Sequence, residues 1–191
     1  MSPRTLLQYE IIREERRAQI MQVALELISE EGFANVTISK IATKAGISKG
    51  LMYNYFESKE QLILEIILEG FNELFCVFDP NKDGVLTNSE MHYFIDEVFV
   101  VIKSNIRFWR LYYMLMFQPE VYRLIEPEVQ KIMQPFMKTV LGYFEKKGSA
   151  DPTCEMKMFC SILDGIRMNF VMDTKNFPME SIRKKLHELY K

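Results

Sequence analysis

The sequence predicts an all-α protein with a small helix-turn-helix head at residues 1–60 and a larger helical body at residues 61–191. Long stretches are rich in Leu, Met, Glu and Lys, which favour helices, and alternating runs of β-branched residues are scarce. Only 8 Gly and 7 Pro interrupt the 191 residues. A hydrophobic content of 48% with 26% charged residues is that of an ordinary globular chain, so we expect a packed core in each part.

The helices are expected where apolar residues recur every three or four positions between caps and breakers. The first is predicted from Tyr9 to Glu31, and its core-facing stripe comprises Ile12, Arg16, Ile20, Val23, Ala24, Leu27 and Ile28. A helix that links the head to the body should begin at Ser58, which forms a predicted capping box with Gln61, and run to Phe78. Further helices are expected at 88–104, 106–118, 119–124, 127–147, 153–173 and 179–190.

The segment from Thr37 to Leu62 is typical of two short helices joined by a tight turn and followed by a third helix. Thr37 and Ser48 are hydroxyl residues where the first and second helices need N-caps. Gly46 lies where the end of the first helix needs a left-handed backbone, and it is also small where two helix backbones must approach closely. We therefore expect the first helix to stop at Gly46.

The second helix of this segment presents two different faces. Its apolar face is predicted to contain Met52, Tyr55 and Phe56. Its outward face is predicted to contain Lys49, Gly50, Tyr53 and Asn54. An outward face of polar groups and a flat ring is suited to contact with the edges of bases in a DNA groove.

At these residues the chain resembles the tetracycline-repressor (TetR) family of bacterial transcriptional regulators. The resemblance rests on EEGF at 30–33, T-x-x-x-I-A-x-x-A-G-I-S-K-G at 37–50 and Y-x-Y-F-x-S-K-E-x-L at 53–62. It is specific from about Gln19 to Leu64, and beyond that it is only a pattern of helices and lengths. It implies a three-helix DNA-binding head, and a body that binds a small ligand and forms a homodimer.

The resemblance also implies a set of residues that lie at the DNA: Thr37, Ser39, Lys49, Gly50, Leu51, Tyr53, Asn54, Tyr55 and Lys59. Thr37, Tyr55 and Lys59 would bind phosphates, which positions the head without reading the sequence. Gly50 would let the backbone come close to the DNA. For each residue the alternative is a solvated helix face or a capping group.

Base contacts are expected from three of these residues. Lys49 can donate to guanine, Asn54 can pair with adenine, and the Tyr53 ring can touch a thymine methyl group. Leu51 stands where the family commonly has a small or hydroxyl residue, so an apolar contact replaces a hydrogen bond there. The net charge of the whole chain is −2, so affinity for DNA has to come from the local placement of cations.

A second motif, DPNKDGVLTNSE at 79–90, fits the calcium-loop pattern D-x-[DN]-x-[DN]-G-x5-E at every specified position and resembles an EF-hand loop. The predicted Ca²⁺ ligands are Asp79, Asn81, Asp83, the Val85 carbonyl, Thr87 and Glu90. The alternative is purely structural, because Thr87 and Glu90 also form a capping box and Asp83-Gly84 is a turn dipeptide. Both interpretations stay open at this point.

The middle of the chain is unusually rich in methionine and aromatic residues, which suit an adaptable apolar pocket. The candidate pocket residues are Trp109, Tyr112, Tyr113, Met116, Met133, Phe136, Met137 and Phe170, with Arg107, Arg110, Asn169 or Tyr113 as polar anchors. The alternative for each is plain core packing. The resemblance implies a homodimer through the last two helices, 153–173 and 179–190.

These observations favour a cytoplasmic, homodimeric repressor that a small apolar or aromatic ligand releases from a palindromic DNA operator. The alternative is a calcium-sensing interaction protein that uses the loop at 79–90. An enzyme is not expected, because the only histidines, His92 and His187, lie beside no evident nucleophile. No cofactor is required apart from a possible Ca²⁺. The three cysteines show no metal-like spacing, and the apolar runs are too short to span a membrane.

Overall fold

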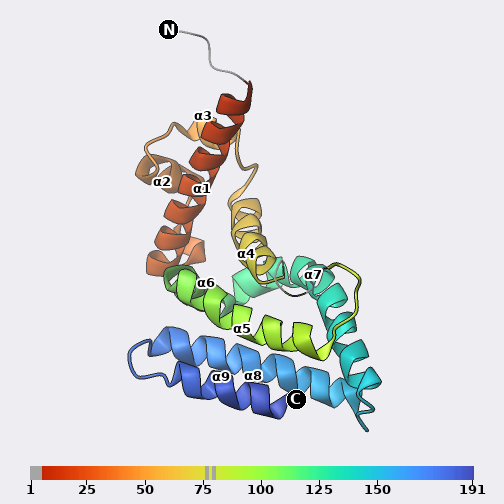
Figure 1. Ribbon diagram of the computed structural model, residues 1–191. Coiled ribbons are helices and arrows are strands. Elements are labelled where there is room, and N and C mark those ends of the chain that lie inside the picture. The colour runs from red at the N-terminus through yellow and green to blue at the C-terminus, as the bar shows by residue number, and fades with distance from the viewer. Residues whose placement is uncertain (1–5, 76–77, 79–80) are drawn as a thin grey trace. The chain divides into compact units, whose positions relative to one another are not determined.

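The computed structural model describes residues 6–75, 78 and 81–191, and within these ranges every regular element is a helix (Figure 1). The elements are α1 (Leu6–Glu31), the 3₁₀ turn η1 (Phe33–Asn35), α2 (Ile38–Lys44), α3 (Lys49–Met52), α4 (Lys59–Phe75), α5 (Asn88–Ser104), α6 (Ile106–Met116), α7 (Pro119–Lys146), α8 (Pro152–Met172) and α9 (Met179–Leu189). The all-α prediction is confirmed. No helix in the described ranges combines the length and the apolar character that a bilayer-spanning helix needs.

The chain divides into two compact units. The head unit is the chain up to Leu68 together with Met114–Ile125, and the body unit is Glu69–Tyr113 together with Glu126–Lys191. The predicted head of residues 1–60 did not include the segment 114–125. This segment is fastened to the head because the Phe33 N–H donates to Gln118 Oε1 at 3.0 Å. Helices α4, α6 and α7 each contribute residues to both units.

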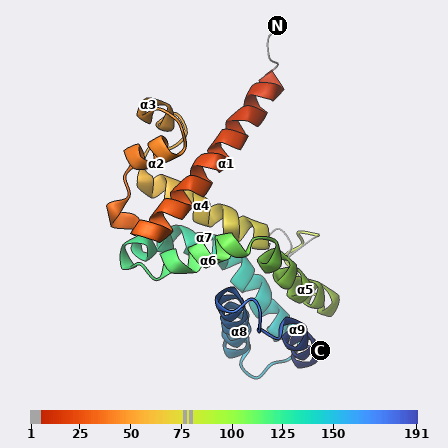
Figure 2. The ribbon, with the colours of Figure 1, turned by 90° about the vertical axis from the view of Figure 1, so that its left-hand side faces the viewer.

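The head unit is built around α1, with α2 in contact with both α1 and α3 (Figure 2). Ile20, Ala24 and Ile28 of α1 are fully buried, which confirms this part of the predicted stripe. Ile12 is 38% exposed, so its place in the stripe is wrong. All residues from Leu7 to Glu15 are exposed, because no other described part of the head covers the first turns of α1.

The body unit has a core of aromatic rings. The Phe94 ring lies 4.8 Å from that of Phe78 and 5.7 Å from that of Phe136, and all three side chains are buried. A second group joins α8 to the chain end, with the Phe159 and Tyr190 rings 4.9 Å apart. Helices α8 and α9 lie side by side as a hairpin, and α5 packs along α9 (Figures 1 and 2).

Helix α7 differs from the prediction of two separate helices at 119–124 and 127–147. It is continuous from Pro119 to Lys146 and carries Pro127 and Pro135 in its interior. Proline removes one intrahelical hydrogen bond but fixes φ near the helical value, so the helix continues where packing compensates for the loss. Val121, Ile125 and Val140 of this helix are fully buried and supply such packing.

Candidate nucleic-acid interface and ligand site

The turn between α2 and α3 is fixed by local hydrogen bonds. The Lys40 N–H donates to Thr37 Oγ1 at 3.2 Å, which confirms Thr37 as the N-cap of α2. At the other end, the Gly46 N–H donates to the Thr43 carbonyl and the Ile47 N–H to the Ala42 carbonyl, the pattern of a Schellman cap. Gly46 has φ +69°. This backbone conformation, which residues with a Cβ rarely adopt, explains the glycine.

The expectation that Gly46 is small for a close helix approach is wrong. A Cβ at this position would meet nothing within 4 Å. Ala42, by contrast, is 1% exposed, so a larger side chain there has no room towards solvent. The requirement at residue 46 is therefore one of backbone conformation, and the requirement at residue 42 is one of space.

Helix α3 is short and begins at the predicted cap, where the Leu51 N–H donates to Ser48 Oγ at 3.1 Å. After Met52 the chain tightens: the Asn54 N–H donates to the Leu51 carbonyl and the Tyr55 N–H to the Met52 carbonyl. Met52 and Phe56 are buried, so the predicted apolar face points into the head. Lys49, Gly50 and Leu51 of α3 are exposed, and so are Tyr53 and Asn54, which lie in the turn after α3 and not on the helix as predicted.

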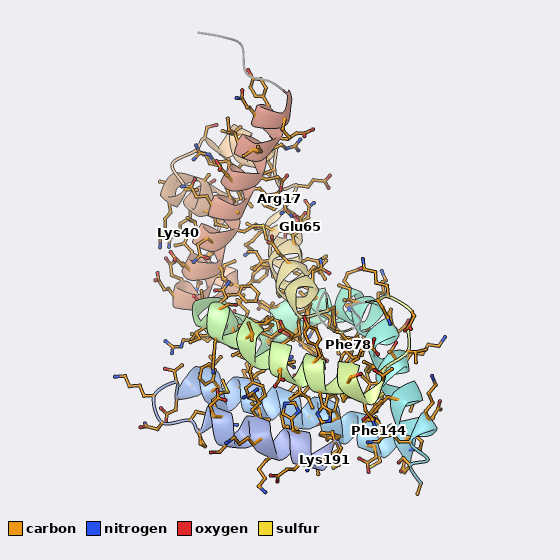
Figure 3. The ribbon with its side chains drawn as sticks, viewed as in Figure 1. Arg17, Lys40, Glu65, Phe78, Phe144 and Lys191 are labelled. Atoms are coloured by element: carbon orange, nitrogen blue, oxygen red, sulfur yellow. The ribbon has the colours of Figure 1, made fainter. Side chains whose placement is uncertain are left out.

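Three cations of the head form ion pairs with described residues, whereas Lys49 on α3 does not. Lys40 forms an ion pair with Glu31, Lys44 lies 3.7 Å from Glu30, and Arg17 of α1 pairs with Glu65 of α4 (Figure 3). Lys49 forms no ion pair with any residue in the described ranges, and neither Tyr53 nor Asn54 makes a side-chain hydrogen bond there. Donors without partners on an exposed surface are available to a ligand.

Lys59 is engaged inside the head. Its ammonium group donates to the Phe33 carbonyl at 2.6 Å and lies 4.0 Å from the centroid of the Phe33 ring. The contact ties the first residue of α4 to η1. A phosphate contact by Lys59 would have to replace or share this hydrogen bond, and its predicted role stays a prediction.

The other predicted phosphate and backbone contacts fall in two places. Thr37 and Ser39 are exposed at the start of α2, and Tyr55 is half-buried in the turn after α3.

The capping box expected at Ser58 takes a shifted form. The Gln61 N–H donates to Ser58 Oγ as expected, but the Gln61 side chain accepts from the Glu57 N–H at 2.6 Å, one residue earlier.

A cavity of about 320 Å³ opens in the body unit between the end of α4 and α7. It is lined by Asn72, Phe75, Phe78, Lys82, Ile132, Pro135, Phe136 and Thr139. The Phe136 ring lies 5.3 Å from that of Phe75 and 4.3 Å from that of Phe78. These rings leave an apolar space with a few polar groups, the usual character of a small-molecule site.

Of the predicted pocket residues, Phe136 alone lines this cavity. Trp109, Tyr112 and Phe170 are buried as core side chains, and desolvation raises the pKa of the Tyr112 hydroxyl. Met116 belongs to the head unit, and Tyr113, Met133 and Met137 are half-buried in the body unit. Among the predicted anchors, Arg110 donates to the Val171 carbonyl at 3.3 Å, and the Arg107 side chain lies outside the described part of the chain.

The loop with the calcium pattern has its side chains bonded to one another. Asn81 donates to Asp83 and to Glu90, and the Val85 N–H donates to Asp83 Oδ1 at 2.8 Å. Thr87 and Glu90 form the capping box of α5, so the structural interpretation of these two residues is confirmed. Asp79 lies outside the described residues, and those described contain no group of three or more metal-binding side chains. Calcium binding stays a prediction.

Comparison with known proteins identifies the head. Residues 20–66 match the sequence model of the family described as "Bacterial regulatory proteins, tetR family". The chain is 48% identical over 52 residues to the HTH-type transcriptional regulator BetI of Agrobacterium fabrum, which is 27% of this chain and 25% of BetI. It is 31% identical over 77 residues to the HTH-type transcriptional regulator SAB2452 of Staphylococcus aureus, 40% of this chain and 42% of that protein. The matched part thus spans less than half of these relatives.

Solved structures resemble the whole chain at low identity. NalD, the secondary repressor of the MexAB-OprM multidrug efflux pump in Pseudomonas aeruginosa, has a TM-score of 0.71 at 18% identity over 93% of this chain and 95% of its own. FadR from Bacillus subtilis, solved with stearoyl-CoA, has a TM-score of 0.69 at 19% identity over 91% and 96%. The SmeT–triclosan complex has a TM-score of 0.70 at 14% identity over 91% and 90%. At these identities the likeness establishes the fold.

Proposed function

Because residues 20–66 match the tetR family of bacterial regulatory proteins, we propose that the protein is a cytoplasmic, homodimeric transcriptional repressor that binds a palindromic DNA operator through the exposed residues of α3 and the turn after it. The observation that carries the proposal is the set of unpartnered donors among these residues. Lys49 projects from α3, and Tyr53 and Asn54 project from the turn that follows it, while the buried Met52 anchors the other side of this segment. Exposed donors without partners on a helix and the turn after it are suited to reading base edges in the major groove.

Dimerisation supplies the second half of the interface. A single head covers too little DNA for specific recognition, whereas a two-fold dimer contacts two half-sites on successive turns. Helices α8 and α9 expose Met158, Met168, Met172 and Leu189. Large apolar side chains on a pair of neighbouring helices support self-association through this surface.

The ligand is proposed to occupy the cavity between α4 and α7. Two proteins of the same fold were solved with apolar or partly apolar ligands, FadR with stearoyl-CoA and SmeT with triclosan, which supports a ligand of this kind. Helix α4 supplies Phe75 to the cavity and begins at Lys59 in the head unit. A ligand that binds better to one position of α4 would shift the spacing of the two heads and release the operator.

The direct test is selection of bound duplexes from a random pool at near-physiological salt. The native protein should enrich one palindromic sequence. Lys49→Gln should lower affinity for that sequence about tenfold and reduce the salt dependence of binding. Lys146→Gln, which removes a cation from the end of α7 in the body unit, is the matched control and should bind as the native protein does. No enrichment by the native protein would refute the proposal.

A further inference from the structure

The lining of the cavity in the body unit can be divided by chemistry into apolar residues, here called the floor, and polar residues, here called the mouth. Phe78 and Phe136 are buried in the floor, and Phe75, Ile132 and Pro135 complete the apolar lining. Of the polar residues, Asn72 and Lys82 are exposed and Thr139 is half-buried. A molecule that fits such a site has an apolar body and one polar end.

The polar mouth favours a negatively charged end. Asn72, Lys82 and Thr139 all carry hydrogen-bond donors, and the lining residues that the structure describes include no carboxylate. Lys82 forms no ion pair with any described residue, so its ammonium group keeps its charge available. A cation beside two further donors is complementary to a carboxylate oxygen.

The loop that follows α4 holds Lys82 at this mouth. The Asp83 N–H donates to Asn81 Oδ1 at 3.1 Å, which closes the backbone around Lys82. Lys82 itself has φ +57°, in the left-handed region. Two carboxylates in the described part of this loop bond to other groups: Asp83 accepts from Asn81 and Val85, and Glu90 accepts from Asn81 and Thr87. Neither of them forms an ion pair with Lys82.

We infer that the effector of this protein is a carboxylate amphiphile of moderate chain length, with its carboxylate at Lys82 and its tail among Phe75, Phe78 and Phe136. The inference rests on the proposed function, because it takes this cavity as the effector site. A volume of about 320 Å³ lies at the lower end of the range for ligand sites, which favours one short chain over a bulky conjugate.

The test is calorimetric titration of the full-length protein, without DNA, with decanoate and with decanol as its neutral match, below the concentration at which either aggregates. Decanoate should bind at one site per chain, and more tightly than decanol. Lys82→Gln should weaken decanoate binding about five- to tenfold and leave decanol binding unchanged. Lys138→Gln, an exposed lysine of α7 that does not line the cavity, should have no effect.

A second variant tests whether the probes bind inside the cavity. Ile132→Trp adds a large ring to a half-buried lining position and should abolish binding of both probes, while circular dichroism and the unfolding midpoint show that the protein still folds. Equal affinity of the native protein for both probes, or unchanged decanoate binding in Lys82→Gln or Ile132→Trp, would overturn the inference, as would no binding at all. Because no DNA is present, this failure is distinct from failure to select an operator.

Discussion

Single residues set the geometry of the head through backbone conformation. Gly46 and Gly50 both lie in the helix-turn-helix, but they differ in what they require. Gly46 holds φ +69° at the end of α2, whereas Gly50 lies inside α3 with a helical backbone. A Cβ at either residue would meet nothing within 4 Å, so the two positions separate backbone strain from steric conflict.

We expect Gly46→Ala to destabilise the head by about 1–2 kcal/mol, because alanine pays the cost of the left-handed region. Gly50→Ala, the matched control, should be neutral or stabilise by up to about 1 kcal/mol, because alanine favours the helix. The free energy of unfolding from urea titrations followed by circular dichroism measures both. Equal effects of the two substitutions would show that φ at residue 46 is not the cause. If Gly50 lies against DNA, its variant should still lose operator affinity.

Single residues also differ in how well the sequence predicts their role. Thr37, Ser48 and Gly46 were identified correctly as caps because capping depends on neighbours three or four residues away. The bond between Lys59 and the Phe33 carbonyl was missed, since it joins residues 26 positions apart and leaves no local pattern. Which face of α6 or α7 turns inward is likewise decided by packing, and of the predicted pocket residues only Phe136 lines the described cavity. The pocket itself stays a prediction.

Helices α5 and α9 contact each other through a group of titratable side chains that bond to one another. His92 Nδ1 and His187 Nδ1 lie 2.5 Å apart, and their rings stack at 4.7 Å. His187 Nε2 lies 2.7 Å from Asp96 Oδ1, to which Arg183 also donates at 2.8 Å. Two facing ring nitrogens at this distance accommodate one proton between them, and a second proton would bring two N–H donors into contact.

Burial and the nearby His187 lower the pKa of His92 below its ordinary value of 6.5, with Lys147 and Lys191 acting in the same direction and Asp96 opposing. The unfolded chain therefore binds more protons than the folded one as the pH falls through 6.5. The contribution of neutral His92 to the free energy of unfolding is therefore present above pH 6.5 and is lost as the pH falls below it. The pKa of Asp96 is lowered from 3.8, and its contribution disappears only at more acid pH.

We therefore expect the body unit to be less stable at pH 5.5 than at pH 7.5, and the difference to shrink in His92→Gln. Trp109, the only tryptophan of the chain, is buried in the body unit and reports its unfolding by fluorescence in urea. An undiminished pH dependence in His92→Gln would assign the effect to other groups.

At the scale of the whole molecule, two helices connect the two sites within one chain. Helix α4 begins at Lys59, beside the predicted DNA contacts, and ends at Phe75, which lines the cavity. Helix α7 starts in the head unit and supplies Ile132, Pro135 and Phe136 to the same cavity. A ligand in the proposed site would therefore contact two helices that also contribute residues to the head unit, as is expected of a ligand-responsive regulator.

Regulation through α4 and α7 requires a dimer. A ligand can weaken operator binding in this way only if two heads are held at a fixed spacing that the ligand changes. Met168→Glu places a charge on the exposed apolar surface of α8 and should shift the protein to monomers in sedimentation equilibrium. Specific operator affinity should then fall at least about a hundredfold, towards the level of nonspecific binding. Met114→Glu, at a methionine exposed on α6 in the head unit, is the matched control and should stay dimeric. A Met168→Glu protein that remains dimeric and binds the operator normally would move the interface away from α8.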